Sequence, residues 1–176
     1  KYYLTIAAVI FKTNSTNTAK NESRFSLFNK LTKKIPFFSN HNDPVSLHKK
    51  VQETELSEYP FFSVQIPLYN EKKVANRVTA AAAAMDYPNF EVLVCDDSTD
   101  ETTQLLYDKW AGSDKVKILH RVNRAGFKGA ALANAITQMD PRTEYVVVFD
   151  ADFVPYPDTL QLFAKYFKVI AENEFN

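Results

Sequence analysis

Two aspartates, Asp150 and Asp152, flank a single small residue directly after an apolar run at residues 146–149. Hard divalent cations such as Mg²⁺ and Mn²⁺ prefer carboxylate oxygens, and two carboxylates at this spacing can reach one ion. Such an ion neutralises a diphosphate and eases its departure as a leaving group. A bare D-x-D also occurs by chance in solvated turns and helix caps. Its place at the end of a predicted buried strand favours the cation site.

A second acidic pair, Asp96 and Asp97, follows the apolar run at residues 90–95. Acidic residues here have a structural use, because they favour the positive end of the helix predicted to start at Ser98. Two adjacent carboxylates exceed what that helix end requires. One of them could therefore accept hydrogen bonds from a nucleobase or a ribose.

Cations and glycines gather in the segment after the third predicted strand. They are Arg121, Arg124, Gly126, Lys128 and Gly129. Basic side chains and flexible backbone beside a helix N-terminus suit a phosphate, although a solvated basic loop is an equally good interpretation. His120, just before them, is predicted to be a strand-end residue rather than a metal ligand, because no second His or Cys lies at ligand spacing.

Alternating strands and helices must position these side chains. After Pro60, short β-branched or aromatic runs alternate with longer helical stretches, which is the βαβ pattern of a parallel α/β sheet. The strands are predicted at residues 62–66, 90–95, 116–119 and 145–149. Ligands bind beyond the carboxyl ends of such strands, so the polar residues that follow three of them should meet at one rim.

Four helices are predicted to connect and follow these strands. They cover residues 72–85, the stretch starting at Ser98, residues 128–139, and residues 158 to about 170. The five alanines at 80–84 give the first helix high propensity. For the second helix, Ser98 and Glu101 match the S-x-x-E capping box.

Composition narrows the class of protein. The chain has 176 residues, of which 45% are hydrophobic, enough to bury one core of domain size. The formal net charge is zero, so no global field attracts nucleic acid. The single cysteine, Cys95, excludes an intrachain disulfide and a multi-cysteine metal cluster.

The first 59 residues differ from the rest. An apolar run at residues 2–11 is either the last half of a transmembrane helix or a buried strand. Residues 25–35 have the spacing of an amphipathic helix with several lysines, which suits either an anionic membrane surface or packing on the domain itself. Because the chain begins with Lys1 and not Met, we interpret it as an excerpt from a longer protein.

Four segments together resemble the family 2 glycosyltransferases of the GT-A fold, and in particular the cellulose synthase-like branch of processive β-glycan synthases. They are I-P-L-Y-N-E at 66–71, D-D-S-T-D-E-T at 96–102, R-A-G-F-K-G-A-A-L at 124–132 and F-D-A-D-F at 149–153. The resemblance covers about residues 60–167 and implies a Rossmann-like, mostly parallel sheet flanked by helices, incomplete at the C-terminus. Residues 60–176 would then be the nucleotide-sugar-binding part, and residues 1–59 a membrane-proximal or linker segment.

The resemblance also implies roles for individual residues. Those that bind the nucleotide sugar would be Pro67, Tyr69, Glu71, Asp96, Asp97, Lys128 and Asp150. The first three would line the nucleotide pocket, one of the adjacent aspartates would contact uracil or guanine, and Lys128 would lie near the phosphates. Asp150 and Asp152 would hold Mg²⁺ or Mn²⁺.

The implied reaction is transfer of a hexose, with inversion, from a UDP- or GDP-sugar to a growing β-linked polysaccharide. The general base of that family is a later aspartate, which is not recognisable before Asn176, nor is the Q-x-x-R-W-type segment. We therefore assign no catalytic residue and expect the isolated chain to be inactive. The parent protein is expected in a membrane, with this domain on the cytoplasmic side.

Three other functions compete with this one. The acceptor could be a lipid phosphate or another small molecule. A nucleotidyltransferase would normally have a glycine-rich phosphate loop near the first strand, and the chain has only three glycines. A non-catalytic sugar-binding or partner-binding module would have no need of a cation site, so the D-x-D and the second acidic pair argue against it.

Overall fold

The computed structural model describes residues 44–174, so the predictions for residues 2–11 and 25–35 lie outside the described residues. Within this range the chain forms two units. One contains residues 59–161 and the other contains residues 44–58 and 162–174. Over the stretch that the structure describes, no helix has both the length and the apolar character needed to cross a bilayer.

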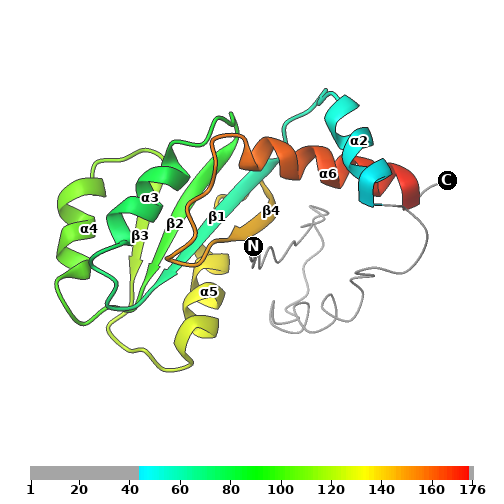
Figure 1. Cartoon of the computed structure of the whole chain (residues 1–176). Helices are drawn as coiled ribbons and strands as arrows, with labels where there is room; N and C mark the ends of the chain where they lie inside the picture. The colour runs from blue at the N-terminus through cyan, green and yellow to red at the C-terminus, as the bar shows by residue number, and fades with distance from the viewer. Residues whose placement is uncertain (1–43, 175–176) are drawn as a thin grey trace, which may run out of the picture. The chain divides into compact units, whose positions relative to one another are not determined.

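Four parallel strands form one sheet in the first unit (Figure 1). They are β1 (Phe61–Leu68), β2 (Phe90–Asp96), β3 (Val116–His120) and β4 (Thr143–Val148). Their order in the sheet is β3-β2-β1-β4, and each pairing is parallel. All four predicted strands are confirmed to within two residues at each end. His120 is confirmed as the last residue of its strand.

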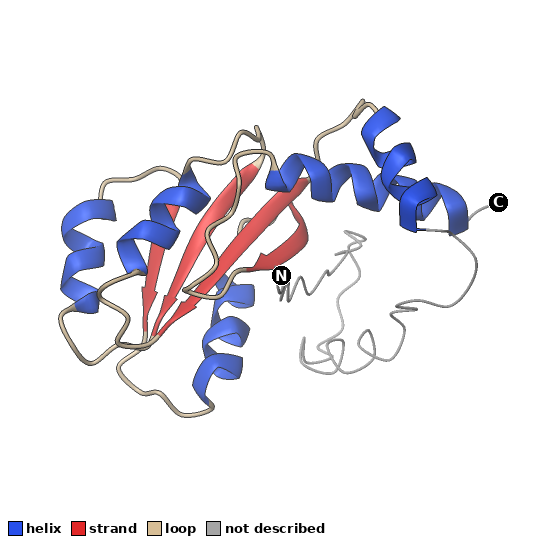
Figure 2. Ribbon diagram, in the orientation of Figure 1, coloured by secondary structure: helices blue, strands red, loops and turns tan. Residues whose placement is uncertain are grey.

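Helices cover both faces of this sheet (Figures 1 and 2). The chain steps outward from β1 to β2 to β3 through α3 (Ala75–Ala83) and α4 (Thr102–Trp110), then returns to β4 through α5 (Phe127–Gln138). Right-handed crossovers in opposite directions place α5 on the face opposite α3 and α4. The central strand β2 is consequently buried along its whole length.

The core on the α5 face is made of small and branched side chains. Leu93 and Cys95 of β2 cluster with Ala131 and Ala135 of α5, and all four are at most 3% exposed. The alanines allow the helix backbone to approach the sheet closely. This packing fixes the first turn of α5 above the carboxyl ends of β1 and β2.

The helices agree with the predictions in place but not at every boundary. α5 begins and ends one residue before its predicted bounds, and α6 covers Thr159–Glu174. α3 is shorter than predicted, because residues 72–74 form a turn in which Val74 and Ala75 both donate backbone hydrogen bonds to the Glu71 carbonyl.

The predicted capping box at Ser98 is wrong. α4 begins at Thr102, and the side chain of its N-cap residue, Glu101, makes no capping hydrogen bond; the Thr102 amide donates instead to the Asp100 carboxylate at 3.0 Å. Ser98 is buried, and its hydroxyl instead accepts a hydrogen bond from the Asn70 amide at 2.9 Å. Glu101 pairs with Lys72 at 3.0 Å. The Ser98 hydroxyl, predicted to cap the helix, thus joins the ends of two strands instead.

The second unit contains α2 (Pro44–Glu53) and the later part of α6. Val51 and Val169 are buried in it. Tyr166 lies within hydrogen-bond distance of His48 at 3.3 Å, and Lys168 donates to the Glu55 carbonyl at 2.9 Å. None of the predicted site residues lies in this unit.

Candidate functional site

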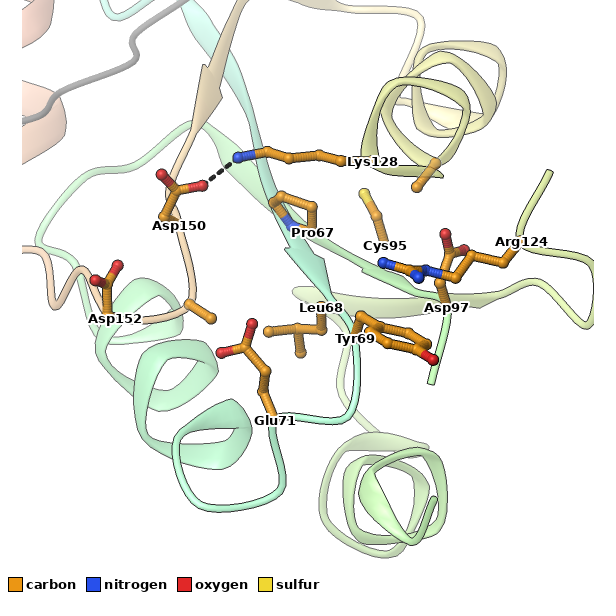
Figure 3. A pocket seen from close by; sticks show the side chains of 12 residues that line it. Pro67, Leu68, Tyr69, Glu71, Cys95, Asp97, Arg124, Lys128, Asp150 and Asp152 are labelled. Carbon is orange, nitrogen blue, oxygen red and sulfur yellow. Dashed lines mark hydrogen bonds and ion pairs between the residues drawn. The ribbon is translucent and has the colours of Figure 1, made fainter. Parts of the chain in front are cut away.

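A pocket of about 530 Å³ opens at the carboxyl ends of β1, β2 and β4 (Figure 3). This volume is in the range of sites for small molecules. The chain leaves β1 in one direction along the sheet, and β4 is added on its other side. The pocket therefore lies at the topological switch point, where open α/β sheets bind ligands.

Most of the predicted site residues meet in this pocket. The structure brings together Pro67, Tyr69, Glu71, Asp97, Lys128, Asp150 and Asp152 along its wall. Arg124, which the sequence placed in a basic segment, also lines it. Asp96 does not line the pocket.

Asp96 is fully buried, and its carboxylate has several partners inside the protein. Oδ1 accepts a hydrogen bond from the Ser98 amide at 3.1 Å, and Oδ2 accepts one from the Thr103 hydroxyl at 2.6 Å. Oδ2 also lies 2.9 Å from Nδ1 of His120. Asp96 therefore joins the ends of β2 and β3 to α4, and Asp97 is the member of the pair that faces the pocket.

Asp97 is held by a bidentate contact with Arg121. Nε and Nη2 of Arg121 donate to the two carboxylate oxygens at 2.8 and 2.6 Å, the fork geometry of a strong charge-assisted pair. The Asp97 side chain is 4% exposed and that of Arg121 is 17% exposed. The hydrogen bonds that Arg121 donates to Asp97 raise the pKa of its guanidinium. Arg121 thus fixes the orientation of Asp97 at the pocket wall.

Tyr69 and Arg124 form a stack at the same end of the pocket. The guanidinium carbon of Arg124 lies 3.4 Å from the centroid of the Tyr69 ring and 5.1 Å from that of Phe127. We call the end of the pocket formed by Tyr69, Asp97 and Arg124 the aromatic half.

The turn after Tyr69 depends on Asn70, which was not among the predicted site residues. Asn70 has a φ of 55°, and its side chain accepts a hydrogen bond from the Thr99 amide at 2.8 Å. With the contact to Ser98, this bond ties the end of β1 to the end of β2. Asparagine tolerates left-handed backbone better than most residues, which is the signal that could have identified it.

The opposite end of the pocket is acidic, as Figure 3 shows for Glu71, Asp150 and Asp152. We call these three residues, with Lys128, the acidic half. Lys128 reaches from the first turn of α5 and forms an ion pair with Asp150. Burial raises the pKa of Glu71, and the nearby charges of Asp152 and Asp150 raise it further, against the opposing effect of Lys128. Negative charge is therefore in excess here.

The donor set suits a hard divalent cation that is completed by a ligand. Mg²⁺ is commonly bound by one or two carboxylates together with phosphate oxygens and water. Among the described residues, no three side chains of the metal-ligating types form a ready cage. Asp150 and Asp152 would supply part of the coordination and a diphosphate the rest, and the unbalanced charge around Glu71 agrees with such an arrangement.

Gly126 determines how the basic segment enters α5. Its φ is 78°, and a Cβ at this position would lie 2.6 Å from the Cβ of Ala130. Phe127 follows with a φ of 50°, so two successive residues are left-handed. This tight entry separates the loop that carries Arg121 and Arg124 from the helix that carries Lys128.

Comparison with known proteins relates this pocket to a family. The family model described as "Glycosyl transferase family 2" matches residues 63–171. Two curated proteins of Arabidopsis thaliana are similar. Glucomannan 4-beta-mannosyltransferase 2 is 36% identical over 62% of this chain, and probable glucomannan 4-beta-mannosyltransferase 10 is 41% identical over 58%. The aligned part is 22% and 20% of those proteins, so the chain matches about a fifth of their length.

Two solved structures share the fold. TarS of S. aureus in complex with UDP-GlcNAc is 30% identical with a TM-score of 0.54, covering 62% of this chain and 31% of that one. The mannosyltransferase PcManGT of Pyrobaculum calidifontis, in complex with GDP-Man and Mn²⁺, is 26% identical with a TM-score of 0.55, covering 82% of this chain and 39% of that one. The pocket described above therefore occurs in a fold that carries nucleotide sugars in these relatives.

Proposed function

The chain belongs to the family 2 glycosyltransferases, and on that premise we propose that it is the donor-binding part of an inverting enzyme. The proposed reaction transfers a hexose from a UDP- or GDP-sugar to a growing β-linked polysaccharide. One observation carries the proposal: an aromatic ring with a carboxylate lies at one end of the switch-point pocket, and a D-x-D pair lies at the other. This arrangement suits a ligand with a nucleobase at one end and a diphosphate at the other.

In the aromatic half, the base would stack on Tyr69 and hydrogen-bond to Asp97. Base–aromatic stacking contributes about 1–3 kcal/mol per base. Although Asp97 already accepts two hydrogen bonds from Arg121, an ionised carboxylate has about four acceptor sites, so it can still accept an N–H of uracil or guanine. Arg121 holds that carboxylate in one orientation.

In the acidic half, the ligand would need positive charge beside its diphosphate. A divalent cation held by Asp150 and Asp152 would supply that charge and assist the departure of the nucleotide diphosphate. Lys128 contributes a second cation and stands on the first turn of α5, where backbone amides also favour an anion. Glu71, beside both aspartates, can accept hydrogen bonds from the hydroxyls of the sugar.

The relatives favour a particular donor for the first test. Both plant proteins are named as mannosyltransferases, and the archaeal structure holds GDP-Man with Mn²⁺. We therefore propose a GDP-linked hexose as the first donor to examine, with a UDP-linked one as the comparison.

Calorimetric titration of GDP and UDP into the chain tests the proposal. With Mn²⁺ present we expect binding of at least one nucleotide, and with EDTA much weaker binding, because the acidic half repels a diphosphate when no cation is bound. Asp152→Asn removes one carboxylate charge with little change in shape and should reduce the effect of Mn²⁺. If a folded sample binds neither nucleotide, the donor-binding function is excluded. If, for a nucleotide that binds, wild type and Asp152→Asn have the same affinity with Mn²⁺ as with EDTA, the cation site is excluded.

We also propose that the parent protein is a membrane enzyme with this domain on the cytoplasmic side, which is supported by the apolar and basic patterns in the first 59 residues. Fractionation of cells that express the parent protein tests this. Recovery of the protein in the soluble fraction without detergent would contradict it.

A further inference from the structure

The aromatic half of the pocket already contains an occupant, which is the side chain of Arg124. Its guanidinium lies 3.4 Å from the Tyr69 centroid, which is van der Waals contact between two flat groups. No second flat group fits between them. A nucleobase that stacks on this face of Tyr69 must therefore occupy the space that Arg124 now fills.

Figure 3 shows how Arg124 reaches this position. The side chain extends into the pocket from the edge, and in this view its guanidinium projects between the labelled side chains of Tyr69 and Asp97. These are the two residues proposed to hold the base. Arg124 and the base would thus compete for the same two surfaces.

The two arginines of this segment are held in different ways. Arg121 pairs with both oxygens of Asp97, and it also donates to the carbonyls of Ala125 and Phe127 at 3.5 and 3.2 Å. Arg124 is held against the rings of Tyr69 and Phe127. A bidentate, nearly buried pair is strong, whereas a cation–π contact at an exposed site contributes only about 0.5–1 kcal/mol.

This difference allows one side chain to move while the loop stays in place. The backbone between residues 121 and 127 is fixed by Arg121, by the Phe127 amide bonded to the Arg124 carbonyl at 2.9 Å, and by Asn123, which accepts from the Ala125 amide at 2.8 Å. Rotation about the side-chain bonds of Arg124 breaks none of these contacts. The pocket can therefore open without rearrangement of the main chain.

We propose that Arg124 is a gate of the nucleobase subsite, stacked on Tyr69 when the pocket is empty and displaced when a base enters. The proposal rests on the proposed function and adds a residue that controls affinity for the base. Because base binding must first break the Arg124–Tyr69 contact, Arg124 weakens that binding. From the strength of an exposed cation–π contact, its removal should tighten binding about two- to fivefold.

Binding of plain nucleosides tests the gate, since uridine and guanosine carry no phosphate and report on the aromatic half alone. The full chain, Arg124→Ala and Arg142→Ala are compared by nuclear magnetic resonance titration with each nucleoside. Arg142 is a matched control, because its guanidinium also lies over a ring, 4.6 Å from the centroid of Phe61 at the other end of β1. We expect tighter nucleoside binding for Arg124→Ala and unchanged binding for Arg142→Ala.

A second signal follows the gate directly. In the empty protein the Nε–H resonance of Arg124, identified by its loss in Arg124→Ala, should be shifted upfield by the Tyr69 ring. Addition of the nucleoside should return it toward the position of a solvated arginine. A resonance that is unshifted in the empty protein, or one that stays shifted at saturation, would overturn the gate.

The outcomes separate the gate from the proposed function. Arg124→Ala that binds nucleosides equally well or more weakly, in a protein whose wild type binds GDP or UDP with Mn²⁺, overturns the gate and leaves the function standing. If Arg124→Ala loses affinity for the diphosphate nucleotide only, Arg124 is a phosphate ligand and the gate is again wrong. Absence of any nucleotide binding by the folded wild type removes both.

Discussion

The two halves of the pocket differ in how their charged side chains are paired when no ligand is bound. In the aromatic half, Asp97 is satisfied by Arg121 and Tyr69 is covered by Arg124. In the acidic half, the carboxylates of Glu71, Asp150 and Asp152 face one cation, Lys128. One half is complete without a ligand, and the other is electrostatically incomplete until positive charge arrives.

This difference indicates what each half contributes to binding. A side chain that is already paired is rigid, so it selects ligands by their shape and hydrogen-bonding pattern. A ligand gains less binding free energy from it, because the ligand must replace contacts that already exist within the protein. A group with unbalanced charge gives little selectivity by itself, but it makes binding conditional on a cation. We infer that the aromatic half governs which nucleotide binds and the acidic half governs when it binds.

The largest effect should come from breaking the pair in the aromatic half. Asp97→Ala leaves the nearly buried Arg121 guanidinium without its carboxylate partner, and loss of one member of a buried pair typically costs about 3–5 kcal/mol. We place Asp97→Ala near the lower limit, since the pocket is open to water, and expect the free energy of unfolding to fall by about 3 kcal/mol. Urea denaturation measures it.

The matched change in the acidic half is Asp150→Ala. The side chain of Asp150 is 40% exposed and that of Lys128 is 52% exposed, so their pair should contribute less than about 1 kcal/mol. Removal of Asp150 also relieves repulsion on Glu71. Equal destabilisation by the two alanine variants would contradict the contrast between the halves.

An intermediate effect is expected at the joint between the halves. Gly126→Ala forces a left-handed residue with a Cβ against Ala130, and the backbone alone costs roughly 1–2 kcal/mol. Thermal unfolding should show the loss. Gly129→Ala is the control, because nothing lies within 4 Å of its added Cβ and alanine is the better helix former by up to about 1 kcal/mol. Destabilisation by both variants to the same degree would show that the left-handed entry into α5 is unimportant.

The smallest effect concerns the charge of Glu71. Its raised pKa means that the folded protein binds this proton more tightly than the unfolded chain, so the stability contributed is present below the ordinary pKa of a glutamate and is lost as pH rises through the shifted value. Without divalent cation, Glu71→Gln should therefore be more stable than wild type at pH 7, by less than about 1 kcal/mol. The gain should vanish in acid. A gain that is the same at pH 3.5 and pH 7 would exclude this electrostatic origin.

The sheet and the place of the site could be predicted from the sequence because they depend on long apolar runs. Most residues of β2 are apolar, and the acidic residues after β2 and β4 indicate the edge of the sheet where the pocket lies. The different roles of two adjacent residues, such as Asp96 and Asp97, are harder to predict from the sequence. Side chains alternate along a strand, and Asp97 shares the pocket with Cys95, whereas Asp96 points to Thr103 of α4. That distinction requires knowing which face each helix covers.

Local rules failed where a distant partner competed. Ser98 has the sequence spacing of a helix cap, but its hydroxyl accepts a hydrogen bond from the backbone amide of Asn70, at the end of another strand. The stack of Arg124 on Tyr69 likewise joins two segments whose meeting depends on the strand order. Sequence spacing records neither contact.

The position of β4 beside β1 has a consequence for folding. Tyr69 and Asp97 directly follow β1 and β2, which are consecutive strands along the chain. Asp150 joins them only after β4 pairs with β1, which brings Tyr145 opposite Phe62. Closing that large loop makes this the pairing of highest contact order in the sheet, and such pairings form slowly. We therefore expect the acidic half to assemble last, so that dependence of nucleotide binding on a divalent cation appears only once the whole sheet has folded.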